Sequence, residues 1–145
     1  MNAGEKDLSY FMLRLKELLN VSFPELQSDS DFITRRSRLA ANAYEGAFMS
    51  GNSPEQCSEI ADFILFENLS FSKFDTVFKV VCSEFDRIMA DEELRPFALK
   101  MLAVCEPVFA AYDIGNDFAA SSAFELLCTE LTGTIAIWIE DHGLQ

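Results

Sequence analysis

The feature that most constrains the fold of this 145-residue chain is an apolar run from Phe97 to Tyr112, FALKMLAVCEPVFAAY. Lys100 and Glu106 are its only charged residues, so every side of a helix drawn through it is apolar. A helix that is apolar all round is typical of the middle of a fold, with other helices packed against it. The run is shorter than the ~20 apolar residues of a bilayer span, and Pro107 interrupts it. We therefore expect an all-α fold around this segment, with a kink or a break at Pro107.

Other stretches also carry apolar residues at helical spacing, which predicts amphipathic helices. The strongest start signal is Ser53-Pro54-Glu55-Gln56, where serine is the cap and the glutamine can complete a capping box. Ser121 or Ser122 is expected to cap the last helix, although the β-branched segment Thr132–Ile139 could instead form a strand. The predicted helices cover about 7–20, 30–50, 54–68, 73–89, 91–112 and 122–143.

Length and composition favour one domain. A chain of 145 residues is near the commonest domain size, and half of its residues are hydrophobic, 14 of them phenylalanine. We predict a single compact domain over residues 1–145, made of about five to seven helices, with residues 1–6 as a disordered tail. No export signal is recognised at the N-terminus, where acidic residues offset the basic ones, and we expect a cytoplasmic protein.

The charge is acidic and unevenly spread. The net charge is −13, and residues 53–145 carry seventeen acidic side chains against five basic ones. Such a surface repels phosphates, so direct binding to nucleic acid is not expected. Two charged clusters are the candidates for an interaction surface, although each has a simpler interpretation as a solvated helix face or a helix start. They are Arg35, Arg36 and Arg38, and Asp91, Glu92 and Glu93.

The residues that support catalysis or metal binding are scarce. His142 is the only histidine and lies at the chain end, so a catalytic triad or a di-iron site is not expected. No two cysteines form a Cys-x-x-Cys pair, so a zinc site is not expected either. The four cysteines are interpreted as free, buried thiols: Cys57, Cys82, Cys105 and Cys128. We predict no catalytic residues, no metal and no cofactor.

Several stretches together resemble a known family. They are Ser9–Leu26, Ala40–Phe48, Ala90–Tyr112 and Glu130–Leu144. They resemble a family of small bacterial proteins of unknown function that is associated with conjugative transposons. The resemblance implies a compact, cytoplasmic helical domain of bacterial origin, and it implies no activity.

Three functions remain open at this point. The leading hypothesis is a non-enzymatic accessory protein of a bacterial mobile element that binds another protein or forms a homo-oligomer, with no role at a membrane. The second is an acidic mimic of nucleic acid that occupies a DNA-binding protein. The third is a helical pocket for a small ligand, which would use Tyr44 or Glu45 together with other polar groups.

Overall fold

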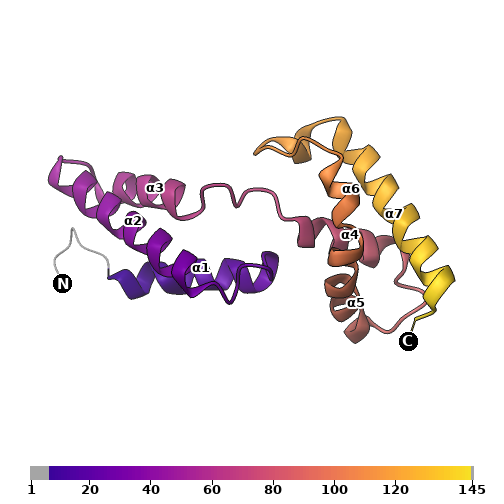
Figure 1. Cartoon of the computed structure of the whole chain (residues 1–145). Coiled ribbons are helices and arrows are strands. Elements are labelled where there is room, and N and C mark those ends of the chain that lie inside the picture. The colour runs from indigo at the N-terminus through magenta and orange to yellow at the C-terminus, as the bar shows by residue number, and fades with distance from the viewer. Residues whose placement is uncertain (1–6, 145) are drawn as a thin grey trace. The chain divides into compact units, whose positions relative to one another are not determined.

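The computed structural model describes residues 7–144, so the expected disordered tail at 1–6 lies outside the described residues. Within that range the structure is all-α, with seven α-helices, one short 3-10 helix and no strand, which confirms the predicted class and helix number. The chain divides into two compact units, one ending at Ser70 and the other starting at Phe71 (Figure 1). The elements are α1 (Leu8–Ser22), α2 (Ser30–Met49), α3 (Pro54–Leu65), α4 (Lys73–Glu84), α5 (Asp91–Val104), α6 (Glu106–Ala110), η1 (Phe118–Ala120) and α7 (Ala123–His142).

In the first unit, α2 packs against both α1 and α3. Each helix buries one residue per turn, because positions four apart lie on the same face. The fully buried residues of α3 are Cys57, Ala61 and Leu65, at a spacing of four. Two of these are small, and α2 contributes the equally buried Ala40, so the two helices can approach closely. The whole cluster comprises Phe11, Leu15, Leu19, Phe23, Ile33, Ala40, Tyr44, Ala47, Cys57, Ala61, Leu65 and Leu69.

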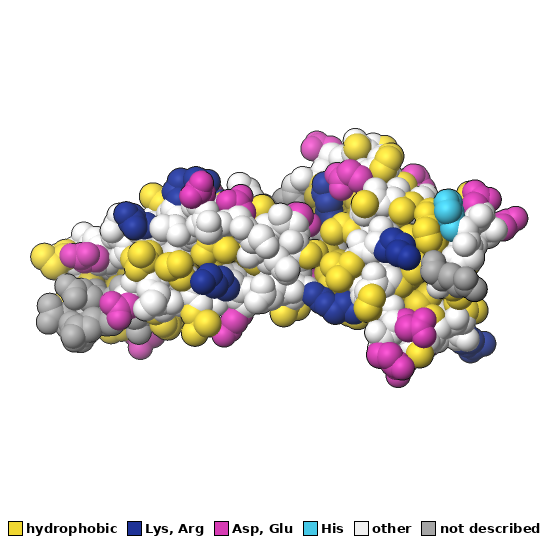
Figure 2. Space-filling model, turned by 60° about the horizontal axis from the view of Figure 1, so that its bottom comes forward, with side chains coloured by type: hydrophobic (Ala, Val, Ile, Leu, Met, Phe, Trp, Pro, Cys, Tyr) yellow, Lys and Arg dark blue, Asp and Glu magenta, His cyan; other side chains and the backbone are white. Residues whose placement is uncertain are grey.

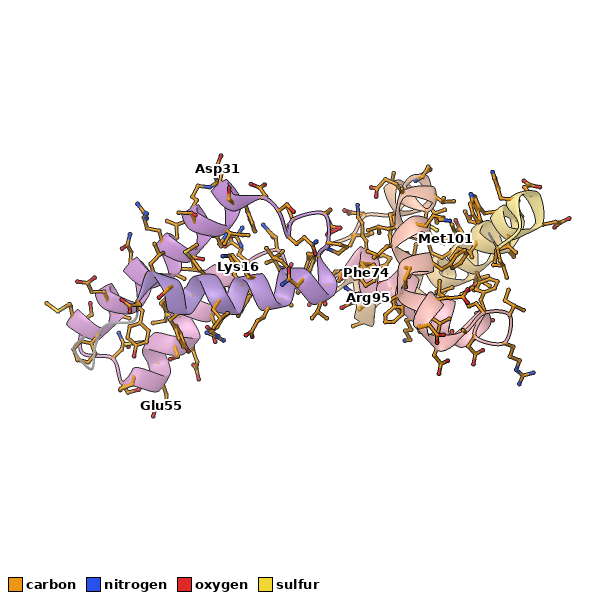
Figure 3. The ribbon with its side chains drawn as sticks, turned by 90° about the horizontal axis from the view of Figure 1, so that it is seen from below. Lys16, Asp31, Glu55, Phe74, Arg95 and Met101 are labelled. Atoms are coloured by element: carbon orange, nitrogen blue, oxygen red, sulfur yellow. The ribbon has the colours of Figure 1, made fainter. Side chains whose placement is uncertain are left out.

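In the second unit, α4 packs against α5 and α7. Its residues Phe74, Val77 and Val81 are fully buried, and Val80 and Thr76 are nearly so. A cation–π contact supports the α4–α5 pair, since the guanidinium of Arg95 lies over the Phe74 ring at 4.6 Å from its centroid (Figure 3). This unit has its own hydrophobic cluster, which extends from Phe74 to Ile135.

The Phe97–Tyr112 segment lies in this second unit and is not one continuous buried helix. It forms the end of α5, then α6, with the junction at Cys105, two residues before Pro107. Proline lacks an N–H and fits the first turn of a helix, so the break occurs there, as the sequence predicts. Only one face of the segment is buried. The exposed positions include Leu99 and several alanines, and exposing the small alanine side chain costs little free energy. The expectation that this segment is buried on every side is therefore wrong.

The predicted helix starts are confirmed where serine is the cap. The Ser53 hydroxyl accepts the Gln56 N–H at 3.2 Å, and the Gln56 side chain accepts the Ser53 N–H at 2.9 Å, which completes the capping box. Ser72 caps α4 in the same way, by accepting the Asp75 N–H. The prediction fails for α7: the Ser122 side chain makes no capping bond, and Ser121 donates to the Phe118 carbonyl of η1.

Two helices end earlier than expected. Beyond α3, Asn68 has a positive φ of 64°, a conformation that asparagine tolerates and that cannot continue a helix. At the end of α4, the last residue Glu84 and the nearby Asp86 place negative charge at the carbonyl end of the helix, where the dipole disfavours it. The Thr132–Ile139 segment is helical within α7, so the alternative of a strand is wrong.

Candidate interaction surface

The structure separates the three arginines of α2 by role. Arg36 is half-buried, and its Nη1 donates to the carbonyls of Glu67 at 2.7 Å and Leu65 at 3.3 Å. Its guanidinium also lies over the Phe32 ring, 4.8 Å from the centroid. Arg36 therefore satisfies carbonyls at the C-terminal end of α3. Arg35 and Arg38 are exposed and form no ion pair within the described part of the chain.

The acidic cluster occupies the first turn of α5. Asp91, Glu92 and Glu93 are all exposed, and none of them supplies a side-chain cap. Negative charge is favourable at this end of a helix, which explains the cluster without a ligand. Glu92 and Glu93 border a small cavity of ≈ 230 Å³ that Lys100 also lines. In residues 7–144, no three His, Cys, Asp or Glu side chains come together in a way that could hold a metal ion.

The four thiols differ in burial, and the histidine packs against an aromatic ring. Cys57 and Cys105 are buried, whereas Cys82 and Cys128 are half-buried, so the prediction of four buried thiols holds for two. Burial raises the pKa of the Cys105 thiol to about 11, and burial also raises the pKa of Cys128 despite the opposing effect of Lys79. Thiols with raised pKa values are weak nucleophiles at neutral pH. His142 stacks on Trp138 with ring centroids 4.5 Å apart.

The residues expected to line a ligand pocket do not share one site. Tyr44 is in the core of the first unit, with its ring centroid 6.4 Å from that of Phe11, and Glu45 is exposed. In the second unit, an open groove of ≈ 590 Å³ runs between α4 and α7. Lys79, Glu125 and Thr129 are among the residues that line it, and the Lys79 ammonium lies 5.6 Å from the Phe124 ring centroid.

The groove borders the outer face of α7, which also carries exposed apolar residues. Leu127, Leu131 and Ile135 turn inward and are fully buried, yet the opposite side of the helix also carries large apolar residues. Leu126 is 56% exposed and Ile137 is 61% exposed. Glu130 and Gly133 lie between them, so the four residues follow one line along the helix. We call Leu126, Glu130, Gly133 and Ile137 the α7 stripe.

The α7 stripe is held in place by a polar contact at its centre. The Tyr112 hydroxyl donates to Glu130 Oε1 at 2.6 Å, and this hydrogen bond raises the pKa of Tyr112 to about 12. At Gly133 the surface is open, since an added Cβ would meet no heavy atom within 4 Å. An exposed glycine inside a helix costs ~1 kcal/mol relative to alanine, so this position weakens α7 without a packing benefit in the unit itself.

The first unit also exposes apolar residues on a helix with acidic neighbours. On α3, Phe63 is 74% exposed and Ile60 is 40% exposed. Hydrophobic side chains reach the surface of both units (Figure 2). The sequence contained a signal for the α7 stripe that the analysis of the core did not use. It is the 4-3-4 spacing of Leu126, Glu130, Gly133 and Ile137 on a helix whose other face already accounts for the buried residues.

Comparison with known proteins finds a matching family and a similar solved structure. The family model described as "Domain of unknown function (DUF1896)" matches residues 3–144. The chain is also similar to the crystal structure of protein PG0816 from Porphyromonas gingivalis, at 38% sequence identity with a TM-score of 0.89 over 95% of this chain and 94% of that one. No curated protein matches the chain.

The fold belongs to the all-α class. No helix between residues 7 and 144 is long and apolar enough to span a membrane. The chain belongs to the DUF1896 family, a domain family of unknown function. The resemblance to a family of unknown function is thereby confirmed, and the association with conjugative transposons stays a prediction.

Proposed function

We propose that this chain is a non-enzymatic protein-binding module, and that the α7 stripe is its binding surface. The observation that carries the proposal is the exposure of Leu126 and Ile137 on one line of a helix that already buries its opposite face. These two residues stand at the ends of the α7 stripe, with Glu130 and Gly133 between them, and large apolar side chains aligned on one exposed helix face offer a surface that a partner can cover. The absence of a reactive thiol, a placed histidine or a metal-ligand cluster within residues 7–144 supports the non-enzymatic part.

The other two hypotheses have less support. On the face shown in Figure 2, Asp and Glu side chains lie scattered among hydrophobic and neutral ones, whereas a mimic of nucleic acid needs a ridge of carboxylates. A small-ligand site would have to use the open α4–α7 groove, because Tyr44 is buried in another core. Cytoplasmic location and a role as an accessory protein of a bacterial mobile element remain part of the proposal, supported by the free thiols and by the sequence resemblance.

The test is capture of partners from nuclease-treated lysate of the native host, with matched variants of the tagged chain. Leu126→Asp combined with Ile137→Asp replaces the two apolar residues of the α7 stripe with charged ones. Leu13→Asp combined with Met49→Asp makes the same chemical change at residues of the first unit that are 60% and 78% exposed. A protein retained by the wild type and by the control pair, and lost from the stripe pair, supports the proposal. Equal retention by both pairs contradicts it.

A further inference from the structure

We infer that the occupant of the α7 stripe is a basic amphipathic helix of another protein, with apolar residues at both ends of the contact and a Lys or Arg at its centre. This inference rests on the proposed function, because it names the chemistry of the partner that the same surface would bind.

The spacing of the stripe favours a helix as the partner. Leu126, Glu130, Gly133 and Ile137 are separated by four, three and four residues, which is the spacing of alternating d and a positions in a coiled-coil seam. Such a seam follows a straight line along the helix and meets the equivalent line of a second helix. From Leu126 to Ile137 the seam covers about 16 Å, or roughly three turns.

The charge of α7 favours a basic partner. The helix carries four acidic residues and neither lysine nor arginine. These residues are Glu125, Glu130, Glu140 and Asp141. Opposite charges across an interface attract, and like charges placed opposite each other cost free energy. A partner helix with flanking Lys and Arg is complementary to this surface.

The same charges disfavour a second copy of the chain. Antiparallel pairing of two α7 helices would place Leu126 opposite Ile137 and would bring the two Glu130 carboxylates into adjacent layers of the seam. Each copy also has a net charge of −13, so association would increase the repulsion between copies.

The centre of the stripe provides a place for a cation. Among the described residues, the one hydrogen bond that Glu130 accepts comes from Tyr112, so the carboxylate retains acceptor capacity. One helical turn away, Gly133 presents no side chain, and the space beside it is open. A long Lys or Arg side chain can therefore cross Gly133 and reach Glu130, while its methylene groups contact apolar surface. The lack of a side chain at Gly133 thus leaves space for the partner's Lys or Arg.

The test uses designed helical peptides and the purified full-length chain. The first peptide, of roughly 18 residues, carries leucines at the two ends of a d-a-d-a seam and lysine at its centre. The second replaces the central lysine with glutamate, and the third has a scrambled order with the same composition. Fluorescence anisotropy at low and high salt gives the affinities, and analytical ultracentrifugation reports self-association.

We expect the lysine peptide to bind at least ~10-fold more tightly than the glutamate and scrambled peptides, and to weaken at high salt. Leu126→Asp and Glu130→Gln should each reduce its affinity, the latter while keeping an acceptor for Tyr112. Leu13→Asp is the control and should have no effect. Gly133→Ala separates a binding role from a structural one: it should raise the melting temperature through helix propensity and still weaken binding.

Two outcomes would overturn the inference. Equal binding of the lysine and glutamate peptides, or no binding of either, would exclude the proposed partner chemistry. Self-association that is strengthened by Glu130→Gln and abolished by Leu126→Asp would show that the occupant is a second copy. In either case, the proposed protein-binding function would still be supported if capture of a partner from lysate is lost in the Leu126→Asp and Ile137→Asp variant. If that variant captures the partner as well as the wild type does, both the proposed function and the inference about its partner are wrong.

Discussion

Replacement of Arg36 by alanine tests how the structure divides the basic cluster of α2. The guanidinium donates to two carbonyls at the end of α3 and stacks on Phe32, so it links α2 to α3 within the first unit. A hydrogen bond from a charged donor contributes ~1.5–3 kcal/mol when buried, and Arg36 is only half-buried. Water can replace part of the lost contact, so we expect Arg36→Ala to lower the free energy of unfolding by about 1–2 kcal/mol.

The matched control is Arg35→Ala, which removes the same charge from an exposed neighbour without an ion pair among the described residues. Its expected effect is within about 0.5 kcal/mol. Urea denaturation followed by circular dichroism measures both variants under the same conditions. Arg36→Lys should recover little of the loss, because an ammonium group cannot reproduce the planar guanidinium contact with Phe32 and the carbonyls. Equal stability of the Arg36 and Arg35 variants would refute the reasoning.

Three further predictions concern stability. Ser53→Ala should cost ~1 kcal/mol, because it removes the cap of α3, whereas Ser58→Ala inside the same helix should be close to neutral in urea titrations; a neutral Ser53 variant would contradict the capping box. The Ser37 hydroxyl is fully buried and has no hydrogen-bond partner among residues 7–144. Ser37→Ala should therefore leave the free energy of unfolding in urea titrations unchanged or raise it, and a loss of more than ~1 kcal/mol would contradict this account of the hydroxyl. The pKa of Cys105 is about 11 in the folded chain, raised by burial, so folding favours the neutral thiol. That stabilisation of about 2–3 kcal/mol is complete below the ordinary thiol pKa and is lost as pH rises from about 9 to about 11. Stability measured over this range should therefore fall less steeply in Cys105→Ala, and identical slopes would argue against the shift.

Local signals in the sequence predicted most of the helices. The pair Ser53 and Gln56 forms the predicted capping box, and the break near Pro107 occurs because proline cannot continue the preceding helix. These predictions succeed because a cap or a proline acts on its own neighbours. The end of α3 was predicted at about Asn68, whereas the helix ends at Leu65. The left-handed conformation of Asn68, which excludes it from a helix, cannot be read from residue periodicity.

The candidate surface was harder to predict because it depends on which apolar residues the fold leaves outside. Periodicity identifies Leu127, Leu131 and Ile135 as a buried face and leaves Leu126 and Ile137 off it, but it does not say whether another helix covers those two residues. Arg35, Arg36 and Arg38 looked equivalent in sequence, and only the position of the α3 carbonyls distinguishes Arg36. The interaction surface predicted at Asp91, Glu92 and Glu93 stays a prediction.

The most direct test of the central claim, that the outer face of α7 binds another protein, is photo-crosslinking in the native host. A benzophenone amino acid replaces Thr129, beside the stripe, in one strain and Glu45, on the exposed surface of α2, in another. Irradiation should yield a discrete higher-mass adduct with a second protein from position 129 and none from position 45. No adduct from position 129, or the same adducts from both positions, would contradict the claim.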